Sequence, residues 1–150
     1  MKVEELAYMA GLFDGEGCIH IARIHTQKRN LTFQLVCKVS MYSLPTLEIF
    51  KVSFGGSIRR ESSDEKHNKY GLLHSWAIWG KNSTSFLGQL MPYLRIKKAE
   101  ANLAIEFQSR KATGASKGKW GNSGKTAEAI ALEEQQYLLM RSLKKGEANV

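Results

Sequence analysis

The first apolar pattern along the chain has the period of a helix. Leu6, Met9 and Phe13 recur at i, i+3 and i+7 spacing, which places them on one helix face. The pattern therefore predicts a short helix over residues 3–13. Two glycines within the following residues 14–17 are expected to end it.

A second face of the same predicted helix carries small or short side chains. A surface helix needs only one apolar face, so a face of this kind indicates that another backbone can approach it closely. The predicted contact surface comprises Ala7, Ala10, Gly11 and Asp14.

Two segments with a period of two follow the helix. Residues 31–41 alternate cleanly, because every second residue from Phe33 to Met41 is apolar. Residues 17–27 alternate less regularly. We expect two strands that form a hairpin, with residues 25–30 as its polar and basic tip.

The remaining pattern predicts two more strands and several helices. Pro45 opens a helix that Gly55 and Gly56 end near residue 54. The other expected elements are a strand over 57–62, a strand over 70–79 with Trp76 and Ile78 inward, a helix over 82–91 capped by Asn82, a helix over 97–111, and a last helix over 126–144. The order αββαββα with extra C-terminal helices predicts an α+β fold with a four-stranded antiparallel sheet.

Length and composition fit a single globular domain. The chain has 150 residues, of which 43% are hydrophobic and 24% charged, so it can bury a core. We expect residues 1–111 to form the core of the domain. Residues 112–150 are expected to form a Gly-, Ser- and Lys-rich connector and the last helix.

The charge balance indicates a polyanionic partner. Lys and Arg number 22 against 14 Asp and Glu, a net charge of +8, and the pI is about 9.6. One sheet face carries polar and basic residues, and no sequence is left to cover it. A two-stranded ribbon fits the DNA major groove, so we expect this face to bind DNA. The alternative is an ordinary solvent-facing sheet whose charge serves solubility.

Cysteine usage and hydropathy exclude several protein classes. Cys18 and Cys37 are the only cysteines and lack metal-ligand spacing, which argues against a disulfide framework or a zinc site. No apolar stretch is long enough to span a membrane, and residues at the N-terminus lack the basic start and apolar run expected of a signal peptide. The expected setting is intracellular, either a bacterial or archaeal cytoplasm or an organelle such as a chloroplast or mitochondrion.

Three segments resemble LAGLIDADG homing endonucleases. Residues 6–19, LAYMAGLFDGEGCI, resemble the signature helix and the start of the first strand. Residues 45–55 look like the second helix of the family. Residues 90–103, LMPYLRIKKAEANL, are similar to a landmark in which a lysine precedes a long helix. The resemblance implies a site-specific endonuclease that hydrolyses both strands of a long pseudo-palindromic DNA target.

The resemblance also implies an active site. Glu16 is the metal-binding carboxylate, in place of the more common aspartate, and the Gly15 carbonyl is a second ligand. Mg²⁺ fits such a site, because it prefers hard oxygen ligands and keeps several waters; Mn²⁺ would substitute for it, and Ca²⁺ would bind without cleavage. Lys97 matches the active-site lysine of the family, with Lys98 as the neighbouring candidate. Asp14 is expected to tie the helix end rather than bind metal.

One position departs from the family pattern. Met41 stands where the family often has a glutamine that positions solvent near the metal, and a thioether cannot order water in the same way. Ser40, Tyr42 or Ser43 takes that role, or the solvent network differs.

The single motif implies a homodimer, because a double-strand break needs two active sites. We expect the small helix face to form the interface and the two sheets to form a saddle on DNA. Any one of the expected DNA contacts could instead be a solvated surface residue. The expected base contacts are His20, Ala22, Ile24, Thr32, Gln34, Lys38, Ser40, Arg59, Glu61, Ser75 and Ala77, with Lys28, Arg29 and Asn30 at the hairpin tip and Lys117, Lys119 and Lys125 on phosphates.

Two other functions use the same scaffold. One is an RNA maturase that binds intron RNA without a metal, and the other is a DNA-binding regulator that does not cut. Retention of Glu16 and Lys97 favours the nuclease, because a pure binding protein needs neither residue. Neither a membrane nor a small-molecule substrate is expected.

Overall fold

The computed structural model describes residues 1–25, 31–61, 71–112 and 126–146. The elements in chain order are α1 (Val3–Glu16), β1 (Gly17–His25), β2 (Leu31–Met41), α2 (Leu44–Phe54), β3 (Ser57–Arg60), β4 (His74–Trp79), α3 (Gly80–Leu90), α4 (Lys98–Ala112) and α5 (Ala127–Lys145). The predicted αββαββα order with an added C-terminal helix is confirmed. No helix of these residues is long and apolar enough to cross a membrane.

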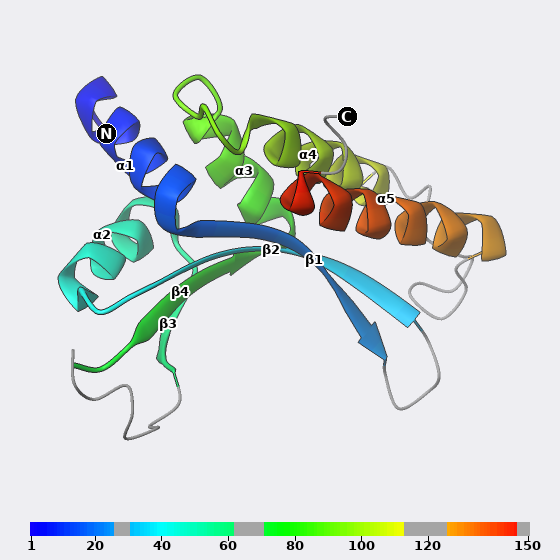
Figure 1. Cartoon of the computed structure of the whole chain (residues 1–150), viewed down its shortest axis with the longest axis horizontal. Coiled ribbons are helices and arrows are strands. Elements are labelled where there is room, and N and C mark those ends of the chain that lie inside the picture. Colours follow the sequence, from blue (N-terminus) through cyan, green and yellow to red (C-terminus); the bar gives the residue numbers. More distant parts are fainter. Residues whose placement is uncertain (26–30, 62–70, 113–125, 147–150) are drawn as a thin grey trace.

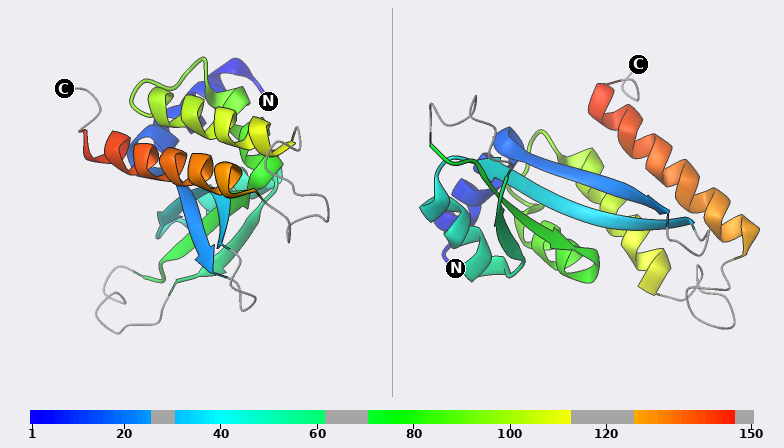
Figure 2. Two further views of the ribbon diagram at one scale, coloured as in Figure 1. Left: turned by 90° about the vertical axis from the view of Figure 1, so that its right-hand side faces the viewer. Right: turned by 90° about the horizontal axis from the view of Figure 1, so that it is seen from below.

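The four strands form one antiparallel sheet in the order β1-β2-β4-β3. Figure 1 shows α1, α3, α4 and α5 above this curved sheet, whose lower face carries no helix of the described segments. Figure 2 shows α4 and α5 side by side along the end of the sheet formed by β1 and β2. The expected arrangement, with one covered face and one open face, is confirmed.

The strand alternation predicted from the sequence determines which side chains enter the core. Phe33, Leu35, Cys37 and Val39 of β2 are fully buried on the covered face, as is Trp76 of β4. Because successive strand residues point to opposite faces, their neighbours in sequence lie on the open face. The register pairs those outward positions across the sheet, for example Ala22 with Gln34 and Ser40 with Ser75.

An aromatic cluster holds α1 and α2 on the sheet. The ring of Phe86 in α3 lies 5.0 Å from Phe13 and 5.0 Å from Trp76, and 4.8 Å from Phe54. The indole nitrogen of Trp76 also donates to the Gly55 carbonyl, at 2.7 Å. Edge-on aromatic contacts of this kind add specificity of orientation to apolar burial. The C-terminal end of α1 is therefore fixed against the sheet, next to the start of β1.

The first helix is longer than predicted. It continues through Gly15 to Glu16, and β1 begins at the next residue, Gly17. A Cβ at Gly17 would lie 2.3 Å from the Phe13 ring and 2.5 Å from the Phe13 carbonyl oxygen. Gly17 therefore permits the direct passage from helix to strand, whereas Gly15 stays helical.

Other element ends also differ from the prediction. Trp79 rather than Asn82 precedes α3, and Asn82 lies within its first turn. The third and fourth strands are shorter than expected, because β3 ends at Arg60 and β4 begins at His74. Thr126 does cap α5, since its hydroxyl accepts from the Ala129 amide at 3.1 Å.

Candidate metal centre and nucleic-acid interface

Asp14 joins the end of α1 to the segment before α4. Its carboxylate is nearly buried and accepts two backbone hydrogen bonds, from the Arg95 amide at 2.7 Å and the Lys97 amide at 3.0 Å. Hydrogen bonds to an ionised acceptor are among the stronger ones in proteins. Asp14 thus has the structural role expected for it, and it brings residues 95–97 to the helix end.

Lys97 lies at the same helix end as Glu16. Its ammonium group donates to the Asp14 carbonyl at 2.5 Å, one residue before Gly15. Lys98 is exposed and begins α4. Lys97 is therefore the lysine whose ammonium contacts this helix end, two residues before the exposed Glu16.

A hollow of about 450 Å³ adjoins Glu16 on the side of α2. Its wall includes Met41 and the three candidates for a solvent-positioning role, Ser40, Tyr42 and Ser43. The Ser43 hydroxyl also lies 2.7 Å from the Thr46 hydroxyl. Polar hydrogen-bonding groups thus surround the thioether in this wall, although the thioether itself orders water poorly.

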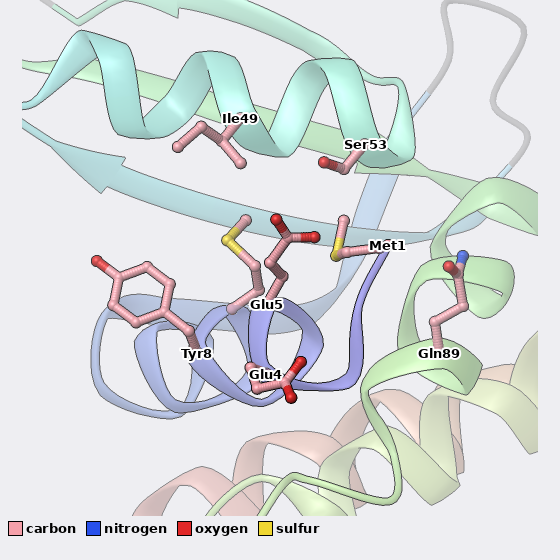
Figure 3. A pocket seen from close by; sticks show the side chains of 8 residues that line it. Met1, Glu4, Glu5, Tyr8, Ile49, Ser53 and Gln89 are labelled. Carbon is pink, nitrogen blue, oxygen red and sulfur yellow. The ribbon is translucent and has the colours of Figure 1, made fainter.

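A second groove lies at the opposite end of α1. It has a volume of about 580 Å³ and is lined mainly by residues of α1 and α2. Figure 3 shows the Glu5 side chain pointing from α1 toward α2 across this groove, and Glu4 also belongs to its lining. Glu5 also accepts from the Lys2 amide at 3.0 Å. The Glu5 carboxylate is therefore engaged by the N-terminal end of its own helix.

The metal donors of one chain are few. Among the described residues, no three His, Cys, Asp or Glu side chains lie close enough to hold an ion together. The available donors at the helix end are the Glu16 carboxylate and the Gly15 carbonyl. Hard oxygen donors suit Mg²⁺ or Ca²⁺, which accept water as remaining ligands. These two donors fit such an ion, but they supply only some of its ligands, so water or other groups must complete the coordination.

Of the four residues predicted to form the small face of α1, two are buried within the chain and two are exposed. Ala10 is fully buried and Asp14 is 8% exposed within the same chain, so their assignment to the dimer surface is wrong. They lie on the side of α1 that packs on its own chain. Ala7 and Gly11 are exposed, and Gly15 follows one turn later at i+4 spacing. A Cβ at Gly11 or Gly15 would meet nothing within 4 Å, so this ridge is open.

The open sheet face contains most of the predicted base contacts. Gln34, Ile24 and Arg59 are exposed there, and six others are half-buried: His20, Ala22, Thr32, Lys38, Ser40 and Glu61. Ser75 and Ala77, in contrast, are only 1% and 4% exposed, so these two predicted contacts are covered in the unbound chain. Six further predicted contacts lie outside the described residues: Lys28, Arg29, Asn30, Lys117, Lys119 and Lys125.

An ion pair explains the burial of Ser75 and Ala77. The Lys38 ammonium lies 2.5 Å from the Glu61 carboxylate, and the two residues flank β4, on which Ser75 and Ala77 lie. The neighbouring Lys38 ammonium, and after it the Ser75 hydroxyl, lower the pKa of Glu61 below its usual value. The two long side chains therefore cover the short ones beneath them.

A cluster around Cys18 was missed by sequence reasoning. The Lys144 ammonium of α5 lies 2.9 Å from the Cys18 sulfur, and the His20 Nδ1 lies 3.7 Å from it. Mainly through His20, and against the effect of burial, the pKa of Cys18 falls to about 7. Burial raises the pKa of Cys37 instead. A basic last helical turn gives no sequence signal of where it docks, which is why Lys144 was not predicted here.

The amino-acid sequence was compared with protein families and with known proteins. The sequence model of the LAGLIDADG endonuclease family matches residues 9–95, more than half of the chain. A relative, the DNA endonuclease I-CvuI of Chlorella vulgaris, is 24% identical over 108 residues, which cover 69% of this chain and 63% of the relative. The match therefore spans less than two thirds of that relative's length.

Solved structures show the same fold. A crystal structure of I-CvuI in complex with its target has a TM-score of 0.73 and 16% identity, and covers 93% of this chain and 82% of that one. The archaeal intron-encoded homing endonuclease I-Vdi141I in complex with DNA has a TM-score of 0.75 and 12% identity, over 93% of this chain and 84% of that one.

Proposed function

The chain belongs to the LAGLIDADG endonuclease family, and we propose that it is a site-specific, metal-dependent homing endonuclease that cuts both strands of DNA as a homodimer. The observation that carries the proposal is the end of α1. There an exposed carboxylate, Glu16, lies beside a lysine, Lys97, that is held by Asp14. Glu16 lines a hollow together with Ser40, an outward residue of β2. Phosphodiester hydrolysis needs a metal ion, which a carboxylate can hold, and a positive group that stabilises the charged phosphate, which a lysine can supply.

Glu16 and the Gly15 carbonyl would hold the divalent ion. When bound, the ion supplies charge stabilisation at the phosphate and lowers the pKa of a coordinated water. Mg²⁺ is the proposed working ion, Mn²⁺ its substitute, and Ca²⁺ an ion that supports binding without cleavage. The use of Ca in a structure of I-CvuI with its target agrees with a site for such ions.

The other residues of the site act on the phosphate and on solvent. Lys97, whose ammonium is already at the helix end, would neutralise charge that develops on the phosphate. The hydroxyls of Ser40, Tyr42 and Ser43 line the hollow beside Glu16 and would hold water where Met41 cannot.

The homodimer would form through the exposed ridge of α1. Ala7, Gly11 and Gly15 repeat at i, i+4 and i+8, so a second helix could approach the backbone closely along this ridge. Both Glu16 side chains would then lie near the two-fold axis, one for each DNA strand. The two open sheet faces would form a continuous saddle for double-stranded DNA. The proposed setting is intracellular, where the chain would meet such DNA.

Glu16→Gln tests the proposal, because it removes the charge with little change in shape. First, bound duplexes are selected from a randomised library in Ca²⁺; then cleavage of the selected duplex is measured in Mg²⁺. The wild-type chain should cut both strands, and Glu16→Gln should bind the duplex with similar affinity but not cut. Glu48→Gln, at an exposed carboxylate of α2, is the matched control and should cut normally.

The alternatives predict different results in the same assay. A DNA-binding regulator would select a duplex and leave it intact in Mg²⁺. An RNA maturase would select no DNA sequence. Cleavage by Glu16→Gln at the wild-type rate would show that the metal assignment is wrong.

A further inference from the structure

Glu61 is an acidic side chain on a face that is otherwise suited to DNA. At the outward positions of β1 to β4, the described residues include no carboxylate, and Glu61 directly follows β3 on the same side. Its amide donates to the Leu73 carbonyl at 2.9 Å, which continues the pairing of β3 with β4. A carboxylate here repels DNA phosphates, so it lowers non-specific affinity for DNA.

Stability does not account for this residue. Glu61 and Lys38 are half-buried, with side chains 31% and 36% exposed, and an ion pair that solvent still reaches contributes only modestly to folding. The pair does have a geometric consequence. It holds two long, flexible side chains over β4 in one arrangement, with an acceptor and a donor 2.5 Å apart. Groups that are ordered before binding lose less entropy when a ligand arrives.

The order of one acceptor beside one donor in this pair matches the edge of a base pair. In the major groove, each pair presents an amino donor beside a keto acceptor: cytosine N4 beside guanine O6, or adenine N6 beside thymine O4. A carboxylate only accepts hydrogen bonds and an ammonium only donates them. The Glu61 side therefore suits the amino base and the Lys38 side the keto base. Guanine suits Lys38 better than thymine, because it offers N7 as a second acceptor and has no methyl group.

We propose that Lys38 and Glu61 together read one base pair in each half-site, with cytosine at Glu61 and guanine at Lys38. The proposal rests on the proposed function, in which the open sheet face lies in the major groove. It assigns the pair to recognition rather than to the stability of the sheet. Because Lys38 approaches from the β2 side and Glu61 from the β3 side, the donor and the acceptor have a fixed order, and the unit distinguishes the two orientations of a base pair.

Exchanging the two charges tests this orientation directly. Duplexes are selected from a randomised library in Ca²⁺ by the wild-type chain, by Glu61→Gln and by the double variant Lys38→Glu with Glu61→Lys. The wild type should prefer one orientation of a C·G pair at two dyad-related positions by about tenfold, near the low end of a well-formed base contact. Glu61→Gln should lose that preference, and the exchanged variant should invert it. Preferences at other positions should not change.

A control variant and two distinct outcomes separate failure of this proposal from failure of the proposed function. Glu106→Gln breaks an exposed ion pair on α4, in which the Arg110 guanidinium lies 3.1 Å from Glu106, and should leave every preference intact. Unchanged preferences in both Glu61 variants, with folding verified by circular dichroism, would overturn the proposal. If the exchanged variant does not fold, retention of the preference by Glu61→Gln alone overturns it. Failure of the wild type to select any duplex would instead reject the proposed function.

Discussion

Asp14 illustrates how a single buried carboxylate can position a site that it does not enter. It accepts hydrogen bonds from the amides of Arg95 and Lys97, and its own carbonyl accepts from the Lys97 side chain. We expect Asp14→Asn to lower the free energy of unfolding by about 1–3 kcal/mol, because one oxygen becomes a donor facing an amide. Denaturant titration measures this loss, and cleavage should fall with it as Lys97 is displaced. Glu16→Gln is exposed and should unfold like the wild type; equal stability of Asp14→Asn would contradict the assignment.

The two cysteines should differ sharply in reactivity. Cys18 is half-buried with a pKa lowered to about 7, whereas Cys37 is fully buried with its pKa raised. Thiolates are the reactive form, so iodoacetamide near neutral pH should modify Cys18 in the folded chain and leave Cys37 intact. Mass spectrometry of the alkylated peptides measures this difference. In denaturant both should react, and early modification of Cys37 would disagree with the inward register of β2.

At the scale of elements, the ridge of α1 decides whether two chains can meet. Gly11→Leu adds a side chain into open space in one chain, so we expect it to fold and to remain monomeric. Light scattering after size exclusion measures the mass of the particle. Gly88→Leu is the matched control, because Gly88 is an exposed glycine of α3 whose Cβ would also meet nothing within 4 Å. It should dimerise, and a dimeric Gly11→Leu chain would rule out this interface.

Local patterns predicted the elements better than they predicted the contacts between them. The alternation in residues 31–41 identified the inward side chains correctly, because a strand has a fixed period of two. The end of α1 was misplaced, since glycine weakens a helix without ending it, and Gly15 is held by neighbouring turns. The burial of Ser75 could not be foreseen from its own strand. It depends on Lys38 and Glu61, which meet across β4 only in the folded sheet.

Helix periodicity also could not predict which small residues of α1 are buried in the chain and which are exposed. Ala7, Ala10, Gly11 and Asp14 are all small or short, so composition alone assigned them to one surface. The segment around Arg95, which is distant in sequence, covers the Asp14 side. The candidate pair Glu16 and Lys97 was predictable because each lies in a motif resembling the family. The Cys18 and Lys144 contact joins segments that carry no such motif.

For the whole molecule, the net charge of +8 predicts strongly salt-dependent binding. Displacement of counterions from DNA makes the logarithm of affinity fall linearly with the logarithm of salt concentration. If a dimer neutralises about six phosphates, its affinity should fall about a thousandfold between about 50 and about 200 mM salt. Titration of the selected duplex by fluorescence anisotropy gives the slope. An affinity independent of salt would contradict a phosphate-bound saddle.

The proposed homodimer leads to a test that separates its two active sites. If each Glu16 serves one DNA strand, a dimer of one wild-type chain and one Glu16→Gln chain should retain a single active site. Such dimers can be purified with two different affinity tags. On a supercoiled plasmid carrying the selected duplex, they should produce mainly nicked circles, whereas the wild-type dimer should produce linear DNA. Linear DNA from the mixed dimer would mean that one Glu16 suffices for both strands. Complete inactivity would mean that both carboxylates hold the metal ions jointly, because losing either one would then disable both cuts.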